Sequence, residues 1–303
     1  MSILVVGSVA LDTIKTPFGE AQDLLGGSAT YFSIAASLFD RVNLVAVIGK
    51  DLPFDKLEVL KSRNIDLKGL QVEEGKTFRW GAEYQYDLNV RQTTLLELNV
   101  FEHFDPKIPH EYVDSEYVFL ANIDPDLQSN VLGQVRSPKL VVCDTINFWI
   151  EHKMDSLISL LGKVDILVLN DSEARELSTK PNLQQACKWI KEKGPQTVVI
   201  KKGEHGLLMM AEDRYFGAPA YPLEEIFDPT GAGDAFAGGF LGYLARSGSL
   251  DGKHLRCAAI YGSVLASFCV EKFGVQRLVE IDQEDLQQRF RDFKHLTHFE
   301  VVE

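Results

Sequence analysis

The chain has 303 residues and a mass of 33.9 kDa, with 45% hydrophobic and 25% charged residues. These values are typical of a globular protein large enough for one α/β domain. The formal net charge of −13 argues against a protein that binds nucleic acid or an anionic membrane. Four cysteines without a Cys-x-x-Cys pair, and no run of about 18 apolar residues, lead us to expect a cytoplasmic protein without disulfides or a transmembrane helix.

The N-terminal segment predicts a buried strand that leads to a carboxylate. Residues 3–9 form an apolar run, as in a parallel strand covered on both faces. Asp12 follows it, and ligands of open α/β sheets bind beyond the carboxyl ends of such strands. An Asp that only closes a turn with Thr13 is an equally good interpretation.

A double glycine precedes the first predicted helix. Gly26 and Gly27 lie before a helix over residues 29–39 with unusually small side chains, and Ser28 is placed to cap it. Glycines in this position allow the backbone to approach another group closely. Alone, this pattern is weak evidence for a binding site.

Residues 77–86 alternate between two faces, one of which carries Phe78, Trp80, Tyr84 and Tyr86. This period of two predicts a half-buried antiparallel strand, which returns over residues 91–99. The hairpin interrupts the alternation of strands and helices, so we assign it to a small separate sheet. We interpret its aromatic stripe as packing, against the main domain or a second subunit, rather than as ligand stacking, although one or two of its members could do both.

The remaining chain alternates strands with helices, which predicts a doubly wound, mostly parallel sheet. Strands are expected over residues 42–48, 117–120, 140–143, 166–169 and 197–201, with a hairpin over 207–216 and helices over 51–64, 154–161, 183–193, 255–270 and 285–296. We expect one domain, residues 1–303, with a small β lid formed by about 13–25 and 75–105. The polar residues placed beyond strand ends are Asp12, Asn122, Asp144, Asn170 and Lys201.

The segment Asp228-Pro-Thr-Gly-Ala-Gly-Asp234 is the most informative stretch. A helix is expected over residues 232–245, and its first turn presents N–H groups of Gly231, Ala232 and Gly233 that small side chains leave uncovered. Such a turn is a site for an anion. Asp234 in the same turn can act as a general base for phosphoryl transfer, or it can merely complement the helix dipole.

Two further observations weigh between these interpretations. Three glycines lie inside the helix, at 238, 239 and 242, and each destabilises it by roughly 1 kcal/mol relative to alanine. An ordinary surface helix has no need of them. Competing phosphate signatures are absent, because position 70 is Leu where a P-loop needs glycine and position 236 is Phe where a dinucleotide fingerprint needs glycine or alanine.

The motif at 228–234 and the helix behind it closely resemble the C-terminal signature of the PfkB, or ribokinase-like, family of small-molecule kinases. Gly26-Gly27 resembles the family's N-terminal signature, and Asn170-Asp-Ser-Glu173 resembles its Asn-x-x-Glu motif. These motifs occur in the family's order along essentially the whole chain. Asn170 and Glu173 also have the spacing of a helix capping box.

The resemblance implies an ATP- and Mg²⁺-dependent kinase that phosphorylates a hydroxyl of a sugar or sugar-like molecule. Asp234 is then the base, and Gly231, Ala232 and Gly233 form the anion hole. Glu173 acts on the metal through water. The implied nucleotide contacts are Asn170, Lys201, Gly203, Gly206, Thr230, Gly231 and Gly233, and the implied acceptor contacts are Asp12, Gly26, Gly27, Ser28, Tyr31 and Asn122.

Several alternatives stay open. Ser28 and Tyr31 stand where ribose kinases carry lysine and asparagine, and Asn122 where they carry glutamate, so ribose is disfavoured and a nucleoside kinase is the closest rival. A catalytically silent ligand sensor on the same scaffold is a rival of another class. The resemblance also admits a K⁺ ion held by carbonyls near Asp228 and residues 270–274, a homodimer through the lid, and an arginine of the lid, Arg79 or Arg91, that reaches the phosphoryl group.

Overall fold

The computed structural model describes residues 2–298 and residue 300. Its main sheet has nine strands in the order β13-β12-β11-β10-β9-β8-β1-β4-β5. All neighbours are parallel except those of the β11-β12-β13 edge, which are antiparallel. This confirms the predicted doubly wound, mostly parallel α/β fold. The strands are β1 Ser2–Val6, β4 Arg41–Gly49, β5 Ile65–Glu73, β8 Tyr117–Leu120, β9 Leu140–Asp144, β10 Ile166–Asn170, β11 Thr197–Lys201, β12 Leu207–Ala211 and β13 Arg214–Ala218.

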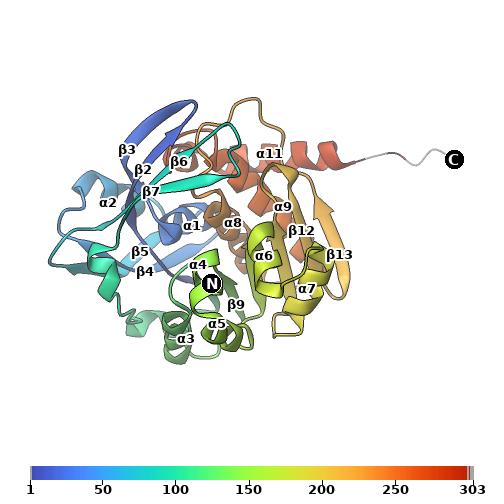
Figure 1. The fold of residues 1–303 in the computed structure, drawn as a ribbon, viewed down its shortest axis with the longest axis horizontal. Helices are drawn as coiled ribbons and strands as arrows, with labels where there is room; N and C mark the ends of the chain where they lie inside the picture. The colour runs from blue at the N-terminus through green and yellow to red at the C-terminus, as the bar shows by residue number, and fades with distance from the viewer. Residues whose placement is uncertain (1, 299, 301–303) are drawn as a thin grey trace.

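Helices cover both faces of this sheet (Figure 1). Alternate residues of β1 show the division, because Ile3 and Val5 belong to one buried cluster and Leu4 and Val6 to the other. The first cluster includes residues of α1 Ser28–Ala36, α2 Phe54–Lys61, α8 Ala232–Ser247, α9 Gly252–Cys269, α10 Gln276–Glu280 and α11 Gln283–Thr297. The second includes residues of α3 Pro125–Gln134, α4 Asn147–His152, α5 Met154–Leu161, α6 Asp171–Ser178 and α7 Leu183–Lys191.

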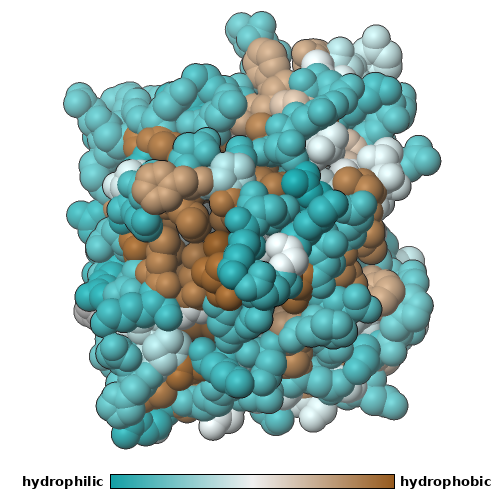
Figure 2. Space-filling model, turned by 90° about the vertical axis from the view of Figure 1, so that its left-hand side faces the viewer, coloured by the Kyte–Doolittle hydropathy of each residue, from teal (hydrophilic) through white to brown (hydrophobic). Residues whose placement is uncertain are grey.

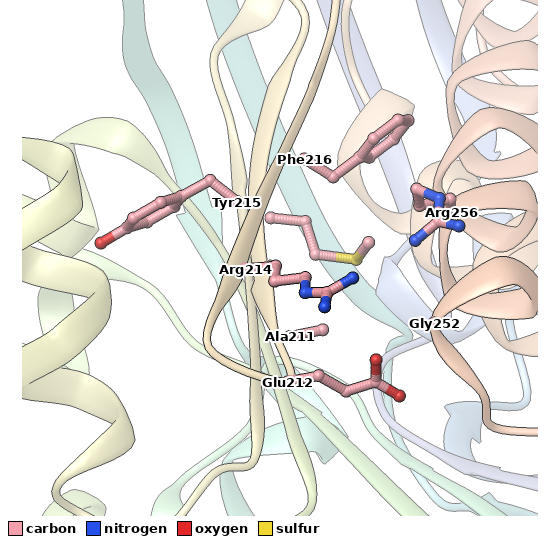
Figure 3. Close-up of a pocket in the computed structure, with 8 residues that line it drawn as sticks. Ala211, Glu212, Arg214, Tyr215, Phe216, Gly252 and Arg256 are labelled. Atoms are coloured by element: carbon pink, nitrogen blue, oxygen red, sulfur yellow. The ribbon is translucent and has the colours of Figure 1, made fainter.

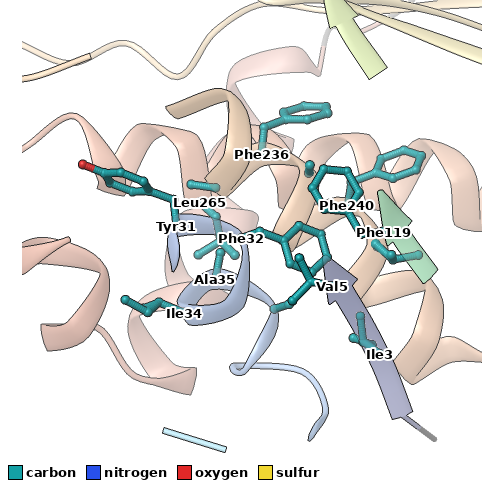
Figure 4. Packing of buried hydrophobic residues seen from close by; sticks show 14 of the residues in the cluster. Ile3, Val5, Tyr31, Phe32, Ile34, Ala35, Phe119, Phe236, Phe240 and Leu265 are labelled. Atoms are coloured by element: carbon teal, nitrogen blue, oxygen red, sulfur yellow. The ribbon is translucent and has the colours of Figure 1, made fainter. Parts of the chain in front are cut away.

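The glycines of α8 serve close helix packing. A Cβ at Gly238 would lie 2.5 Å from the Phe32 carbonyl oxygen of α1, and one at Gly239 would lie 2.7 Å from the Tyr261 carbonyl oxygen of α9. Beneath this contact the ring of Phe32 stacks on Phe119 of β8, with centroids 4.1 Å apart (Figure 4). The narrow flank predicted for α8 is therefore occupied by two neighbouring helices.

A second sheet of four strands, in the order β3-β2-β6-β7, lies at one side of the main domain (Figure 1). Its strands are β2 Ala10–Thr16, β3 Gly19–Gly26, β6 Phe78–Tyr84 and β7 Arg91–Glu97. We call this sheet the lid. Its segments coincide closely with the predicted ones, except that its first strand begins at Ala10.

The expectation of one strand over residues 3–9 is wrong. β1 ends at Val6, and Asp12 lies inside β2 of the lid rather than beyond a strand of the main sheet. The chain bends at Gly7 and Ser8, where a Cβ on Gly7 would lie 2.6 Å from Ala121 Cβ. The Ser8 hydroxyl accepts a 3.0 Å hydrogen bond from the Ser28 N–H, which fixes the bend against α1.

None of the helices in residues 2–298 is long and apolar enough to cross a bilayer.

Candidate active site

The turn before α8 has the geometry expected of an anion site. Gly231 is the N-cap residue with φ of 75°, a left-handed conformation that favours glycine. A Cβ there would lie 2.3 Å from the ring of Tyr31, so any other residue would clash. The Ala232 N–H donates a 3.3 Å hydrogen bond to the Pro229 carbonyl, which shows that one of the three N–H groups expected to be free has a partner within the turn.

Lys201, at the end of β11, brings a positive charge to this turn. Its Nζ atom lies 2.7 Å from the position that a Cβ of Gly233 would take and 3.6 Å from Oδ2 of Asp144, with both side chains largely buried. Burial lowers the pKa of Lys201, but the carboxylates of Asp144, Glu173 and Asp234 outweigh it and raise the pKa. The ammonium group therefore stays charged beside the helix N-terminus, where an anionic phosphate is favoured.

Asp234 has the titration expected of a general base. Burial and the charge of Asp144 raise its pKa from 3.8 to about 7, against the opposing effects of Lys201 and Arg91. A base with a pKa near the working pH has both a useful ionised fraction and a proton affinity matched to the transfer. Asp234 as a residue is partly exposed, which leaves an approach for an acceptor hydroxyl.

Asn170 and Glu173 form the predicted capping box of α6. Asn170 Oδ1 accepts from the Glu173 N–H at 2.8 Å, and Glu173 Oε2 accepts from the Asn170 N–H at 2.7 Å. Glu173 is buried, and burial with the charge of Asp144 raises its pKa to about 7. The capping interpretation is confirmed, and it leaves Oε1 of Glu173 as the oxygen that can face a metal.

The donor set suits Mg²⁺ held mainly through water. Within residues 2–298 there is no group of three or more His, Cys, Asp or Glu arranged to hold a metal ion. Mg²⁺ commonly keeps several waters and uses one or two carboxylates together with substrate phosphates. Glu173 fits that role, while Asp144 is already paired with Lys201.

On the acceptor side, the double glycine packs against the chain itself. A Cβ on Gly26 would lie 1.9 Å from Oδ2 of Asp12, and one on Gly27, whose φ is 92°, would lie 2.5 Å from the Ser8 carbonyl oxygen. Asp12 accepts a backbone hydrogen bond from Gly27, while burial, followed by the charge of Asp228, raises its pKa to about 8. The close approach predicted at this motif is therefore present, and its partners are Asp12 and Ser8.

Tyr31 and Ser28 stay predicted acceptor contacts, but the cap expected at Ser28 is absent. Tyr31 is 1% exposed and its ring supports Gly231, so it braces the anion turn from inside the core. Ser28 does not cap α1, because the N-cap residue is Gly27 and no side chain caps the helix. The Ser28 hydroxyl instead lies 3.1 Å from that of Ser8. Both side chains are buried, and the Tyr31 hydroxyl has no hydrogen-bond partner among the described residues.

Asn122 remains an acceptor prediction. It follows β8, and its Oδ1 accepts a 2.9 Å hydrogen bond from Nε1 of Trp149 in α4. Its side chain is partly exposed, so the amide nitrogen is available as a donor. The contact with Trp149 orients it.

Asp228 and Thr230 tie the anion turn to the lid. The Asp228 carboxylate accepts the N–H groups of Thr230 at 2.8 Å and Gly274 at 2.9 Å. The Thr230 hydroxyl lies 3.1 Å from the Tyr84 hydroxyl at the end of β6. The sequence did not single out Tyr84 within its aromatic stripe, because nothing in such a stripe indicates which hydroxyl will reach another segment.

The backbone groups suggested for a K⁺ site are already hydrogen-bonded in part. The Val270 carbonyl accepts the N–H groups of Phe227 at 2.9 Å and Asp228 at 3.4 Å. The Thr230 carbonyl accepts the Cys269 thiol at 3.5 Å. A cation here would share these oxygens with donors of the chain, so the K⁺ site stays a prediction.

Gly203 and Gly206, the expected nucleotide contacts after β11, both have positive φ. A Cβ on Gly206 would lie 2.0 Å from the Ala218 carbonyl oxygen, and one on Gly203 would lie 2.0 Å from Oδ1 of Asn89. Asn89 belongs to the turn between β6 and β7. The lid therefore reaches across to the segment expected to follow the nucleotide.

A separate hollow of about 310 Å³ lies between the β12–β13 hairpin and the start of α9, where Arg214, Glu212 and Arg256 border it (Figure 3). Gly252 lines it at one end of α9, while Cys269 at the other end contacts Thr230. An 18-residue helix is about 27 Å long. The hollow therefore lies at the far end of α9 from the site.

The chain is similar to known proteins over most of its length. Residues 111–282 match the pfkB family of carbohydrate kinases. A cytidine kinase of Thermococcus kodakarensis is 32% identical over 257 residues, which cover 83% of this chain and 91% of that protein.

Solved structures share the fold. A nucleoside kinase of Burkholderia thailandensis in complex with inosine superposes with a TM-score of 0.77 at 19% identity, covering 96% of this chain and 97% of that one. An Escherichia coli structure described as a ribokinase II bound to ATP and Mg²⁺ gives a TM-score of 0.79 at 16% identity, covering 96% and 99%.

Proposed function

The chain belongs to the pfkB family of carbohydrate kinases, phosphotransferases that act on a hydroxyl group, and from this premise we propose that its acceptor is a nucleoside and its donor Mg²⁺-ATP. The observation that carries this choice is the 32% identity to a cytidine kinase over nine-tenths of that protein. Nucleoside kinases of Methanothermobacter thermautotrophicus and Methanocaldococcus jannaschii, 27% and 25% identical over 90% of this chain, support it.

The donor side of the site supports ATP. Lys201 and the N–H groups of Gly231 and Gly233 would hold the negatively charged phosphates. Asn170 is the register partner of Lys201 at the end of the neighbouring strand β10, and Thr230 directly precedes Gly231. Mg²⁺, when bound, neutralises phosphate charge and orients the transferred group. Glu173 would hold that ion through water, as its single free carboxylate oxygen suggests.

The transfer itself requires little covalent chemistry from the protein. The acceptor oxygen attacks the γ-phosphorus, its proton passes to the Asp234 carboxylate, and the bond from phosphorus to the bridging oxygen breaks to release ADP. Asp234 at the first turn of α8 stands beside the N–H groups that would stabilise the charge on the phosphoryl oxygens. Its pKa of about 7 suits a proton acceptor at neutral pH.

The inner face of the lid favours a nucleoside over a small sugar. Asp12 and Trp80 are register partners in neighbouring lid strands, so their side chains lie on the same face of the lid. Trp80 is partly exposed and offers an aromatic surface beside the carboxylate expected to hold the acceptor hydroxyls. A base can stack there while its sugar lies against Asp12 and Gly27.

Turnover of ATP by purified protein with Mg²⁺, across cytidine, uridine, inosine, adenosine, deoxyribose, myo-inositol and fructose 6-phosphate, tests this assignment. We expect phosphorylation of one or more nucleosides at the highest kcat/KM. Exclusive turnover of a sugar would refute the nucleoside assignment and leave the kinase activity intact. ATP binding without turnover of any acceptor would favour the silent sensor.

The lid also supports a homodimer. β7 is the edge strand of the lid, and Leu95, Leu96 and Leu98 at its end are exposed. Apolar side chains gather in a hollow with a polar rim on the side of the molecule where α2 and the lid lie (Figure 2). An unpaired, apolar edge strand favours pairing with a second copy. A Leu95→Lys, Leu98→Glu variant that elutes with the same mass as wild type in light scattering would exclude this interface.

A further inference from the structure

We propose that the hollow between the β12–β13 hairpin and the start of α9 is a second binding site, and that its ligand is a nucleoside monophosphate. Two arginines would bind the phosphate, and an apolar floor with one carboxylate would hold the nucleoside. The choice of this phosphate ester rests on the proposed function, because it is the product of that reaction. The hollow itself lies at the opposite end of α9 from the active site.

The hairpin supplies one wall of the hollow. Met209 and Phe216 are register partners, as are Ala211 and Arg214, and directly opposed residues of an antiparallel pair share a face. Met209 and Ala211 belong to the buried cluster that includes α9, so this face is directed toward that helix. Tyr215 alternates with its neighbours, and its hydroxyl donates to a carbonyl of α7 on the other face (Figure 3).

The first turns of α9 supply the opposite wall. Gly252 and Arg256 are four residues apart, so they lie on the same side of the helix, and both line the hollow. Oε2 of Glu212 lies 2.8 Å, and Nη1 of Arg256 3.4 Å, from the position that a Cβ of Gly252 would take. The side chains of Glu212, Arg214 and Arg256 are therefore directed into one space (Figure 3).

These three charged groups have no partners. Among the residues that the structure describes, Glu212, Arg214 and Arg256 form no ion pair and no side-chain hydrogen bond, whereas Asp213 in the same turn is paired with Lys191. Two guanidinium groups that face one space repel each other, and an anion between them removes that repulsion. Each also offers a planar fork of donors that matches a phosphate. In a chain of net charge −13, this pair favours an anionic ligand.

The rest of the lining indicates what else the ligand carries. Met209 is buried and Phe216 is partly exposed, and together they offer an apolar floor on which a flat ring can pack. The Glu212 carboxylate repels a phosphate, but it accepts hydrogen bonds from hydroxyl or amino groups. A bare phosphate would use neither feature. The volume of about 310 Å³ lies within the range of small-molecule sites.

Calorimetric titration with CMP, with inorganic phosphate as the comparison, tests this site. Excess cytidine competes with CMP at the acceptor side of the active site, so the CMP binding that persists reports on the hollow. Hydrogen bonds to charged groups are strong enough that we expect Arg214→Gln and Arg256→Gln each to weaken this binding by about 10- to 100-fold. Lys253→Gln is the matched control, because Lys253 is an exposed cation beside Gly252 that does not line the hollow. It should bind CMP as wild type does.

A substitution at Glu212 separates a nucleotide from a bare anion. Glu212 has a φ of 49°, which glycine adopts readily, so Glu212→Gly keeps the turn and removes the carboxylate. Binding of inorganic phosphate should become tighter, because a repelling charge is lost. The ratio of CMP affinity to phosphate affinity should fall by about tenfold, because the nucleoside loses a charged acceptor.

Unchanged CMP binding in both arginine variants, or an equal loss in Lys253→Gln, would overturn the site. Inorganic phosphate that binds as tightly as CMP would overturn the nucleoside monophosphate as its ligand. Initial rates without added CMP should be the same in the arginine variants as in wild type, because both residues lie far from the active site. If wild type phosphorylated only a sugar, or no acceptor, the proposed function would fail separately, and the CMP titration would still decide whether the hollow is a site.

Discussion

Replacing Asp234 by Asn should abolish turnover while leaving the fold intact. The amide keeps the size of the carboxyl group but cannot take the acceptor's proton, and loss of a general base commonly costs about 10²–10⁴ in rate. We expect kcat to fall within that range, with ATP still bound, because Lys201 and the N–H groups of the turn are unchanged. A variant with kcat near wild type would refute the assignment of the base.

The same substitution should stabilise the protein at alkaline pH. A pKa of about 7 in place of 3.8 corresponds to roughly 4 kcal/mol against the charged form. Because Asp234 is a partly exposed residue, screening by solvent reduces this to about 1–2 kcal/mol. Since 1 kcal/mol shifts Tm by about 2 °C in a chain of this size, we expect the Asn variant to melt about 2–4 °C higher at pH 8.

The sign of the pH dependence makes this prediction sharp. Above pH 7, Asp234 is charged in both the folded and the unfolded state, and the folded state bears the full cost. As the pH falls through 7 toward 4, the folded state takes up a proton first and the cost disappears. The difference in Tm between Asn variant and wild type should therefore shrink from pH 8 to pH 4, as calorimetric melting curves would show. A variant less stable than wild type at pH 8 would refute the reasoning.

Three further substitutions separate structure from chemistry. Glu173→Gln keeps an oxygen for the Asn170 N–H and removes a buried carboxylate whose pKa is raised to about 7, so we expect Tm at pH 8 to be no lower than that of wild type. The Mg²⁺ concentration for half-maximal turnover should rise about tenfold, and an unchanged Mg²⁺ dependence would contradict the metal role. Lys201→Met leaves Asp144 buried without its partner, which should lower the free energy of unfolding by about 3–5 kcal/mol at pH 8. The loss should be smaller at pH 5, because Asp144 has a raised pKa and protonates more readily there. Equal losses of stability in melting curves at pH 8 and pH 5 would argue against the ion pair. In Gly231→Ala the added methyl group would clash with the Tyr31 ring, and alanine would have to adopt a φ of 75°. We therefore expect the free energy of unfolding to fall by about 1–3 kcal/mol and kcat to fall as well. A variant with wild-type Tm and kcat would show that this position does not require glycine.

The fold could be read from the sequence because its signals are local. Strands β8 and β11 and helix α5 lie at the predicted residues, since each is a short apolar or amphipathic run bounded by turn residues. The bend after β1 was missed because Gly7 and Ser8 interrupt the run only slightly. Its cause, the hydrogen bond to Ser28 and the proximity of Ala121, comes from segments distant in sequence.

The parts of the candidate site that depend on local backbone geometry could be predicted from the sequence. The parts that depend on packing between distant segments could not. Gly231 and the capping box of Asn170 and Glu173 are visible in sequence because each uses neighbouring residues. Tyr31 stays a predicted acceptor contact, but its packing against Gly231 was not foreseen, because its position in a motif does not tell which side of the turn its ring occupies. The sequence alone also could not decide whether Arg79 or Arg91 is the lid arginine nearer the phosphoryl group.

The contacts between the lid and the main domain explain why closure and catalysis should be coupled here. Asn89 touches the segment after β11, Tyr84 touches Thr230 before α8, and Arg91 lies opposite Tyr84. The first two contacts join the lid to different segments of the main domain, the loop after β11 and the turn before α8, so an open lid would lose both together. Arg91, whose positive charge lowers the pKa of Asp234, would be withdrawn from the base in the same movement.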